Sequence, residues 1–269
     1  MTVVPLRTRP SAELERAVAE DSRSMVGRIS MILGAFQPGE RRIGISEISR
    51  RIGLPKSTVA RIVNELVEYR MLERDGKGVR FGIRMFELGE SASRPHNLKR
   101  IALASMADLR STVNLTVHLA VLERTDVVYL EVLRTRETPP LPSRVGGRMS
   151  AYATAVGKVL LAWSPESIVD ELLSRPLVQV GPRTITDATE LRHELERVRS
   201  AGVALDQEES RAGITCVAAA VTGSDGLPVA AISATGWTKD VDVEQVALAV
   251  RAAGLRLSRT VTKYPRLVG

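Results

Sequence analysis

A run of hydroxyl, amide and basic side chains between residues 56 and 64 has the spacing of a nucleic-acid-binding helix. Such groups donate hydrogen bonds to phosphates and base edges, and here they recur on one side of a helix. They are Lys56, Ser57, Thr58, Arg61 and Asn64. The positions between them are apolar (Val59, Ile62 and Val63), which predicts one buried face and one DNA-facing face.

The residues just before this helix predict the first half of a helix-turn-helix. A short helix is expected from three isoleucines on one face: Ile45, Ile48 and Ile52. Ser46 would cap it, Gly53 can adopt the left-handed conformation that ends it, and Pro55 suits the first position of the next helix. Because the second helix of such a motif enters the major groove, we predict DNA contacts from it and from Ser46.

Two flanking segments complete a predicted winged helix. An earlier helix is expected to bury one apolar face, formed by Met25, Ile29, Ile32, Leu33 and Phe36. After the recognition helix, residues 72–83 predict a β-hairpin, since Asp75-Gly76 is a strong turn signal. Lys77 and Arg80 would lie at its tip and reach phosphates as a wing.

The positive charge of the chain is concentrated in this segment. The net charge is +7, and residues 22–82 carry 12 Lys and Arg against 6 Asp and Glu. A compact basic domain beside a nearly neutral one is typical of nucleic-acid-binding proteins. Two alternatives stay open: a winged helix that binds a protein partner, and an enzyme with an N-terminal docking module. We favour double-stranded operator DNA as the partner.

The rest of the chain predicts a linker helix and an α+β domain with a mainly antiparallel sheet. A break is expected at Arg94-Pro95, followed by a longer helix from Asn97. Strands are expected at 114–122, 127–133, 203–205, 215–222 and 228–235. Helices are expected near 152–162, 165–173 (capped by Ser164), 188–201 and 243–262. The predicted domains are an N-terminal extension (1–21), the winged helix (22–83), the linker helix (84–96) and the α+β domain (97–269).

Composition and cysteine usage favour a soluble cytoplasmic protein. No apolar run approaches the roughly 18 residues that span a bilayer, and the N-terminal segment lacks an apolar signal core. Cys216 is the single cysteine, which excludes an intrachain disulfide and is compatible with a reducing cytosol. We expect Cys216 to be a small buried hydrophobe, and we expect no membrane partner.

The sequence offers no defensible catalytic or metal-binding constellation. The histidines are scattered, and no His/Cys/Asp/Glu cluster has metal spacing, so neither metal nor cofactor is expected. The segment Ala155-Val-Gly-Lys158 resembles the end of a phosphate loop but lacks its leading glycine and following Ser or Thr. His118 is expected to be half-buried. An acidic cluster is expected to lie in a solvated loop: Asp206, Glu208 and Glu209. We therefore predict that the chain is not an enzyme.

Three segments make the chain resemble the IclR family of bacterial transcriptional regulators along nearly its full length. The first is Ile48-Ser-Arg-Arg-Ile-Gly-Leu-Pro-Lys-Ser-Thr-Val-Ala-Arg61. The second is Gly146-Gly-Arg-Met-Ser-Ala-Tyr-Ala-Thr-Ala-Val-Gly-Lys-Val-Leu-Leu-Ala162. The third begins Ala204-Leu-Asp-Gln-Glu-Glu-Ser-Arg-Ala-Gly-Ile-Thr-Cys216 and runs on to Gly236. The resemblance implies a GAF-like effector domain, a homodimer or homotetramer, and ligand control of promoter binding as repressor or activator.

The resemblance also implies where the effector binds. The family's pocket maps onto Ala155, Val156, Asp206, Ile214, Cys216, Ser233 and Thr235, and we add Arg144 and Met149. The residue chemistry allows such a pocket by itself: arginines can pair with a carboxylate (Arg144, Arg148 and Arg211), and helix N–H groups near Tyr152 could hold an anion. We therefore predict a regulator that senses a small, organic-acid-like metabolite.

Overall fold

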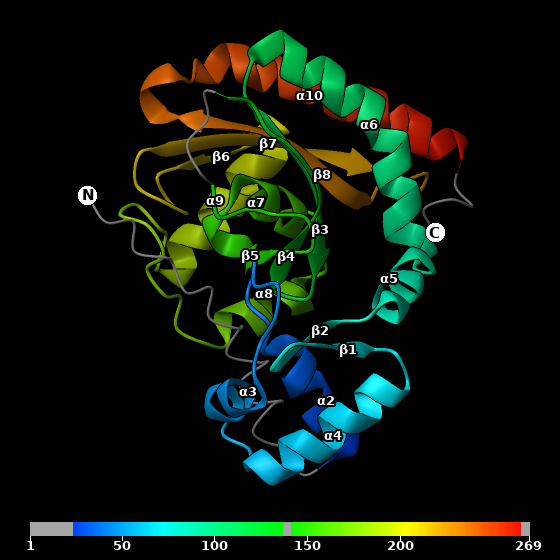
Figure 1. Ribbon diagram of the computed structural model, residues 1–269. Coiled ribbons are helices and arrows are strands. Elements are labelled where there is room, and N and C mark those ends of the chain that lie inside the picture. Colours follow the sequence, from blue (N-terminus) through cyan, green and yellow to red (C-terminus); the bar gives the residue numbers. More distant parts are fainter. Residues whose placement is uncertain (1–23, 137–140, 265–269) are drawn as a thin grey trace. The chain divides into compact units, whose positions relative to one another are not determined.

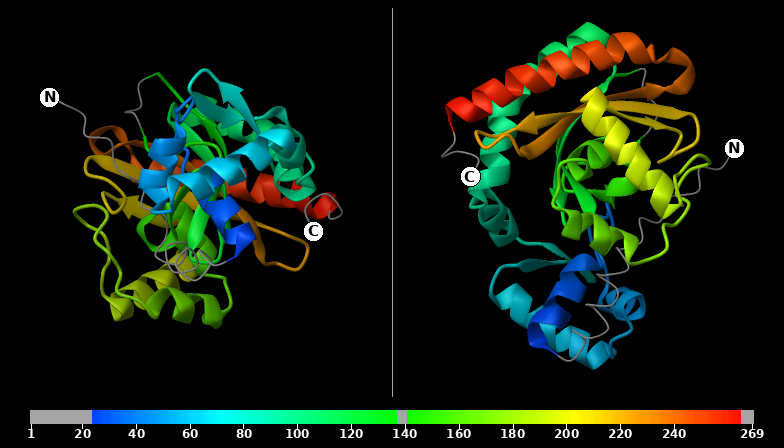
Figure 2. Two further views of the ribbon diagram at one scale, coloured as in Figure 1. Left: turned by 60° about the horizontal axis from the view of Figure 1, so that its bottom comes forward. Right: turned by 180° about the vertical axis from the view of Figure 1, so that it is seen from behind.

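The computed structural model describes residues 24–136 and 141–264, apart from the side chains of residues 93 and 94. The chain divides between Ala92 and Ser93 into two compact units, whose elements can be followed in Figures 1 and 2. The predicted N-terminal extension lies outside the described residues. Among the described residues, no helix combines the length and the apolar character needed to cross a bilayer.

The first unit is a winged helix. Its elements are α2 (Met25–Gly34), α3 (Ile45–Ile52), α4 (Lys56–Glu68), β1 (Leu72–Asp75), β2 (Gly78–Phe81) and α5 (Ile83–Glu90). Ile32, Ile48 and Ile62 are fully buried and hold the three helices together. β1 and β2 pair in antiparallel register, and an isolated bridge from Ile43 to Val79 joins the segment before α3 to the hairpin.

The turn between α3 and α4 follows from local backbone chemistry. Gly53 takes the left-handed conformation (φ 71°), and its N–H donates to the Ser49 carbonyl at 2.9 Å. The Ser49 hydroxyl donates to the Leu54 carbonyl at 2.7 Å, which fixes the exit from the turn. Pro55 is the N-cap of α4 rather than its first residue. Ser46 does not cap α3, because the helix already begins at Ile45 and Gly44 occupies the N-cap position.

The buried face of α2 is rotated from the one that its hydrophobic spacing predicts. Met25 is 40% exposed, whereas Met31 is buried. The buried side also includes Gly27 and Ala35, small residues that a hydrophobic pattern underweights. Close helix packing therefore selects this side of α2, and the expected position of Met25 is wrong.

The second unit is built on one antiparallel six-stranded sheet. The strands are β3 (Thr116–Glu123), β4 (Asp126–Leu133), β5 (Arg148–Ser150), β6 (Ala204–Gln207), β7 (Ile214–Thr222) and β8 (Pro228–Trp237). Their order across the sheet is β5-β4-β3-β8-β7-β6. The predicted α+β class with an antiparallel sheet is confirmed, whereas β5 was not predicted because it is only three residues long.

Helices cover both faces of this sheet, as Figures 1 and 2 show. The long helices α6 (Ser93–Val113) and α10 (Val243–Lys263) pack together on one face over an apolar core that includes Met106, Ile232 and Leu257. The other face is covered by α7 (Ala155–Leu161), with α8 (Glu166–Leu173) and α9 (Ala188–Ala201) outside it. Short 3-10 turns, η1 (Ala151–Ala153) and η2 (Thr238–Asp240), complete the described elements of this unit.

Three helix boundaries in the second unit differ from those predicted. The expected break at Arg94-Pro95 is absent, since α6 begins at Ser93 and Pro95 is tolerated in a first turn. The helix expected from Tyr152 is a 3-10 turn followed by α7, which Thr154 caps. Ser164 does not cap α8: Pro165 is the N-cap, and the Ser164 hydroxyl donates to the Leu160 carbonyl.

Gly157 allows α7 to pack directly against the preceding turn. A Cβ at this position would lie 2.1 Å from the Ala151 carbonyl oxygen, and backbone cannot yield as a flexible side chain can. The Gly157 N–H donates to Thr154 Oγ1 at 3.1 Å, so the tight turn and the helix cap form together. This close approach fixes α7 against the turn before it, and α7 in turn packs on β7 and β8.

We predict that Gly157→Ala lowers the melting temperature markedly, because an added methyl group must displace the backbone at a cost of about 1–3 kcal/mol or more. Gly34→Ala in α2 is the matched control, since nothing lies within 4 Å of its added methyl and alanine favours a helix. Thermal unfolding followed by circular dichroism measures both variants. Equal melting temperatures for the two would contradict the packing assigned to Gly157.

Candidate functional site

The outer face of α4 carries the donors that the sequence predicts for DNA. Lys56, Ser57, Arg61 and Asn64 are exposed, and Thr58 is half-buried. The opposite face is buried in the core of the winged helix through Val59, Ile62, Val63 and Leu66. The helix therefore presents a fixed polar surface on a rigid apolar base. Ser46 is also exposed, on α3.

Two of these side chains are held by neighbours in the structure. Arg61 forms an ion pair with Glu65, one helical turn later, at 2.7 Å. The Asn64 carbonyl oxygen accepts a hydrogen bond from Arg74 of β1, which leaves the Asn64 NH₂ group as its outward donor. Arg74 thus joins the wing to the recognition helix. The sequence reasoning missed it, because the strand pattern alone does not show which side chains reach α4.

The wing tip carries one of the two predicted basic residues. Lys77 lies in the two-residue turn between β1 and β2 and is exposed. Arg80 lies in the body of β2 instead, directly opposite Glu73, with which it forms an ion pair at 2.7 Å. Its expected place at the tip is wrong, because the hairpin turn is only two residues long and ends at Gly78.

An arginine–glutamate network fixes α3 against the end of α2. Arg51 pairs with Glu40 at 2.7 Å and with Glu47 at 2.8 Å, and it donates to the Ala35 carbonyl at 2.8 Å. Hydrogen bonds from Arg50 and Arg51 lower the pKa of Glu47 to about 2. These arginines are therefore occupied in holding the motif together.

A small cavity lies in the second unit, between the sheet and α7. Its volume is about 30 Å³, roughly the room for one water molecule. Its wall is formed by strand residues, by the loop after β6, by the start of α7 and by residues 141–143. The lining residues are His118, Tyr129, Leu141, Pro142, Ser143, Met149, Thr154, Val156, Asp206, Ser210, Arg211, Ile214, Cys216 and Thr235.

The structure brings most of the predicted effector residues to this cavity. Met149, Val156, Asp206, Ile214, Cys216 and Thr235 line it. Ala155 and Ser233 lie just behind the wall: Ala155 is fully buried in the core, and Ser233 is 3.4 Å from the His118 ring. Arg144 is exposed and donates to the Val145 carbonyl, away from the cavity. Arg148 is also exposed and lies 3.9 Å from Asp126, whereas Arg211 does line the cavity.

Two strand residues that the sequence reasoning did not place in the site contribute polar groups. His118 pairs in register with Ser233 on β8, and Tyr129 pairs with Ala120 on β3. Both point to the face of the sheet that also carries Cys216 and Thr235. The alternation of side chains along β3 predicts which face of the sheet His118 is on. The sequence does not show that β3 lies beside β8, so it does not place His118 next to Ser233 and Thr235.

His118 is buried and neutral. Its Nε2 lies 2.8 Å from Ser143 Oγ, and its Nδ1 lies 3.3 Å from Thr235 Oγ1. Burial, with a smaller effect of Arg134, lowers the pKa of His118 to about 3. A neutral ring can donate through one nitrogen and accept through the other, so His118 links residue 143 to β8. It is 3% exposed, not half-buried as expected.

Asp206 and Glu209 are buried, so the expectation of a solvated acidic loop is wrong for both. Asp206 accepts hydrogen bonds from the Glu209 and Ser210 N–H groups at 2.8 and 3.2 Å and from Ser210 Oγ at 2.6 Å. Burial raises the pKa of the Asp206 carboxyl, and these hydrogen bonds oppose it. Cys216, predicted to be a buried hydrophobe, is buried, and burial raises the pKa of its thiol to about 12.

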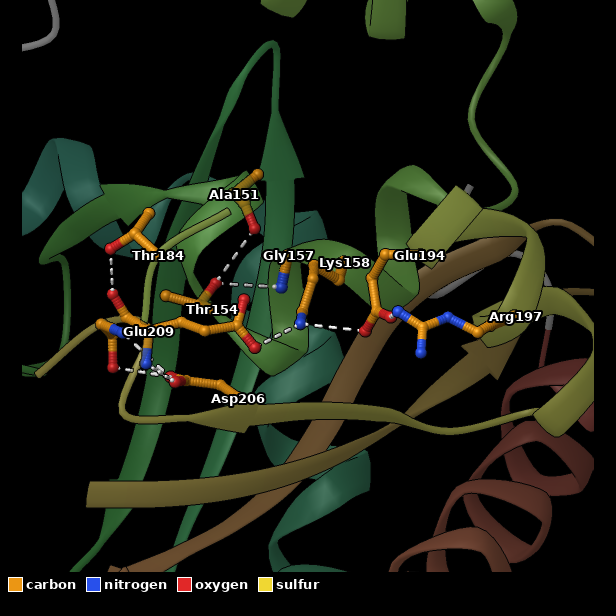
Figure 3. A network of polar contacts seen from close by, with 10 residues as sticks. Ala151, Thr154, Gly157, Lys158, Thr184, Glu194, Arg197, Asp206 and Glu209 are labelled. Atoms are coloured by element: carbon orange, nitrogen blue, oxygen red, sulfur yellow. Dashed lines mark hydrogen bonds and ion pairs between the residues drawn. The ribbon is translucent and has the colours of Figure 1, made fainter. Parts of the chain in front are cut away.

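A buried ion-pair cluster fixes the loop behind the cavity (Figure 3). Lys158 of α7 is fully buried, and its Nζ lies 2.6 Å from Glu209 Oε1 and 3.0 Å from Glu194 Oε1 of α9. Glu194 also pairs with Arg197. Three segments are thereby joined: α7, α9 and the loop after β6. We call Lys158, Glu194 and Glu209 the Lys158 cluster.

The same loop is held from its other side. Thr184 Oγ1 donates to the Glu209 carbonyl at 2.6 Å and accepts from the Gly181 N–H at 2.7 Å. A Cβ at Gly181 would lie 2.5 Å from the Glu208 carbonyl oxygen, so only glycine permits this approach. The backbone that presents Asp206, Ser210 and Arg211 to the cavity is therefore fixed on two sides. Among the described residues, no group of three His, Cys, Asp or Glu side chains is placed to hold a metal ion.

The fold and the two sites define a class: a winged-helix DNA-binding unit followed by a sheet-based unit with a small-molecule cavity. Two family models match the chain. "IclR helix-turn-helix domain" matches residues 26–76, and "Bacterial transcriptional regulator IclR C-terminal" matches residues 91–259.

The chain is also similar in sequence to known transcriptional regulators and in structure to a known IclR homolog. The transcriptional regulator KdgR of Dickeya chrysanthemi is 33% identical over 216 residues, which are 79% of this chain and 70% of KdgR. XynR of Escherichia coli K12 is 30% identical over 246 residues, 89% of this chain and 97% of XynR. The crystal structure of an IclR homolog from Microbacterium hydrocarbonoxydans, complexed with 4-hydroxybenzoate, is 33% identical with a TM-score of 0.83. It covers 89% of this chain and 100% of that chain.

The chain belongs to the IclR family of bacterial transcriptional regulators. It is a transcriptional regulator with an N-terminal helix-turn-helix for DNA and a C-terminal ligand-binding domain. The relatives named above are regulators rather than enzymes.

We predict that Lys158→Met lowers the free energy of unfolding by about 3–5 kcal/mol at pH 7, because it leaves the buried Glu209 carboxylate without its cation, whereas Glu194 keeps Arg197. Burial raises the pKa of Glu209, and Lys158 opposes this. Removing Lys158 raises the pKa of Glu209 in the folded state further above its value in the unfolded state. The folded variant then binds a proton that the unfolded chain releases, so its stability falls more steeply as pH rises. The difference in melting temperature between the wild type and the variant should therefore grow from pH 5 to pH 8.

Lys99→Met is the matched control for this experiment. Lys99 is 40% exposed on its side chain and pairs with Glu131 at 2.9 Å, so its loss should cost less than about 1 kcal/mol. A pH-independent effect of Lys158→Met, or an effect no larger than that of the control, would contradict the structural role of the Lys158 cluster.

Proposed function

We propose that this protein binds operator DNA through α4 and the wing and that a small carboxylic acid in the cavity controls this binding. The observation that carries the proposal is the exposed donor face of α4, supported from beneath by a fully buried apolar face. The cavity in the second unit supplies a separate ligand site. Since operator DNA is the partner, we place the protein in the bacterial cytoplasm.

Base contacts come from the first turns of α4, and phosphate contacts come from the wing. Arg61 is long enough to reach a guanine edge once it exchanges Glu65 for DNA, and Ser57 and Thr58 lie nearer the helix start. Lys77 at the wing tip is a point charge suited to phosphate. Two further residues are secondary candidates for DNA contacts. Ser46 lies on α3 rather than on α4, and Arg80 is paired with Glu73.

The proposed functional unit is a homodimer, which α5 and the adjoining wing strand support. Apolar side chains are exposed on this surface, and several line an open groove. They are Phe81, Ile83, Phe86 and Leu88, between 42% and 63% exposed. Covering such a surface with its copy removes apolar area from water. A dimer would place two recognition helices about 34 Å apart, one turn of DNA. A homotetramer would pair two such dimers.

The effector class follows from the cavity wall and from the homologue. Arg211 is among the residues that line the cavity, and arginine side chains bind carboxylates. The Microbacterium homologue is complexed with an aromatic carboxylic acid, 4-hydroxybenzoate. A cavity of about 30 Å³ must widen to admit such a molecule, so binding requires the wall to move. A ligand that fits only the widened form can shift the conformational equilibrium of the protein.

The test of DNA binding is fluorescence anisotropy with the DNA upstream of the protein's own gene, at several salt concentrations. We predict saturable binding that resists excess non-specific competitor. Arg61→Ala should reduce the preference for this DNA, whereas Lys77→Ala should weaken all binding and lower the salt slope by about one. Lys239→Ala, an exposed lysine of η2 in the effector domain, is the charge-matched control. Binding no tighter than to random DNA at low salt would favour a protein partner for the winged helix.

The dimer surface is tested with Phe86→Asp, which places a charge on the exposed face of α5. We predict that this variant sediments as a monomer in analytical ultracentrifugation, while the wild type is a dimer or larger. Val178→Asp changes an equally exposed apolar residue in a loop and should leave the assembly intact. An unchanged assembly in Phe86→Asp would exclude α5 from the interface.

A further inference from the structure

Tyr129 offers a strong hydrogen-bond donor that the protein itself satisfies poorly. Its side chain is 5% exposed and lines the cavity. Its hydroxyl donates to Met149 Sδ at 3.4 Å, and a thioether is a weak acceptor. A buried tyrosine hydroxyl normally has a full hydrogen-bond partner. The hydroxyl of Tyr129 is thus available to an oxygen of a ligand.

Asp206 provides a complementary acceptor at the same cavity. An ionised carboxylate has about four acceptor positions. The Glu209 and Ser210 N–H groups use the two at Oδ1, and Ser210 Oγ uses one at Oδ2. Within the described part of the chain these bonds leave one acceptor position on Oδ2. Tyr129 and Asp206 line the same cavity, whose volume of about 30 Å³ is roughly the room for one water molecule.

We propose that Tyr129 and Asp206 together bind a hydroxyl group of the effector, so that the protein selects hydroxylated carboxylic acids. This inference rests on the proposed function of the cavity as the effector site. The effector hydroxyl accepts from Tyr129 and donates to Asp206. The carboxylate of the same molecule pairs with Arg211.

Among hydroxyl, carboxylate, carbonyl, ether and ammonium groups, only a hydroxyl both accepts from Tyr129 and donates to Asp206 through a single atom. A carboxylate oxygen accepts from Tyr129 but repels the Asp206 carboxylate, and an ether or a carbonyl gives Asp206 no proton. An ammonium group donates to Asp206 but cannot accept from Tyr129. Burial raises the pKa of Tyr129, so its hydroxyl stays protonated and remains a donor. An acid without the hydroxyl leaves both buried groups without this bond, which discriminates strongly against it.

In the ligand-free protein, Met149 accepts the hydrogen bond of the Tyr129 hydroxyl. Its sulfur occupies the acceptor position beside Tyr129, and its side chain is only half-buried. Methionine is unbranched and flexible, so it can leave this position at little cost and enlarge the cavity. The effector oxygen then replaces a weak acceptor with a strong one. Met149 therefore fills the place of the effector hydroxyl in the ligand-free protein.

The experiment is isothermal titration calorimetry of the full chain with two pairs of acids that differ by one hydroxyl group. The pairs are 4-hydroxybenzoate with benzoate, and lactate with propionate. We expect the wild type to bind at least one hydroxy acid at least tenfold more tightly than its partner acid. Tyr129→Phe should reduce this preference to less than threefold.

Tyr152→Phe is the matched control, because the Tyr152 hydroxyl bonds to Val178 outside the cavity lining. It should keep the preference of the wild type. Equal binding of both members of each pair, a preference that survives in Tyr129→Phe, or no binding of either hydroxy acid would overturn the proposal. Binding to upstream DNA, measured on the same preparations, separates this failure from failure of the proposed function. Retained DNA binding leaves the proposed binding to upstream DNA standing, and its loss removes that proposal as well.

Discussion

The buried charge of Lys158 is the constraint on which the effector domain depends. A lysine that is fully removed from water is strongly destabilising unless carboxylates surround it, so α9 and the loop after β6 must both approach α7. On its other side the loop approaches Gly181 so closely that a Cβ there would lie 2.5 Å from the Glu208 carbonyl oxygen. The charge cluster thus fixes the backbone that presents Asp206, Ser210 and Arg211. Apolar packing alone would hold the two layers together but would leave this loop less defined.

This rigid loop faces an adaptable wall, and the contrast suits a regulator. The Asp206 side of the cavity is held by the Lys158 cluster and by Thr184. Met149 and residues 141–143 also line the cavity, and Ser143 is held by the His118 ring and by Arg134, which donates to the Ser143 carbonyl. In the proposed mechanism, a ligand that widens the cavity displaces Met149 while the Asp206 side stays fixed. Such a movement can bias a conformational equilibrium only if the two forms differ in ligand affinity.

Much of the fold could be predicted from local sequence, while the site could be predicted only in part. Gly53 ends α3 in the left-handed conformation, as predicted, and the helices predicted near 188–201 and 243–262 are α9 and α10. Lys158 was not identified as a buried residue, since a lysine in a sequence usually indicates an exposed position. Arg144 and Arg148 were expected at the cavity from their charge alone. Tyr129 and His118 were missed, because they come to the same cavity as Cys216 and Thr235 only through the strand order β4-β3-β8-β7. Local spacing in the sequence does not encode that order.

The most direct test of effector control is the affinity for upstream DNA with and without a saturating acid that calorimetry shows to bind. Anisotropy at fixed salt measures both values on the same preparation. We predict that the bound acid changes the dissociation constant for DNA at least fivefold, which is about 1 kcal/mol of coupling. An acid that binds tightly and leaves the DNA affinity unchanged would contradict the claim that this cavity controls the winged helix.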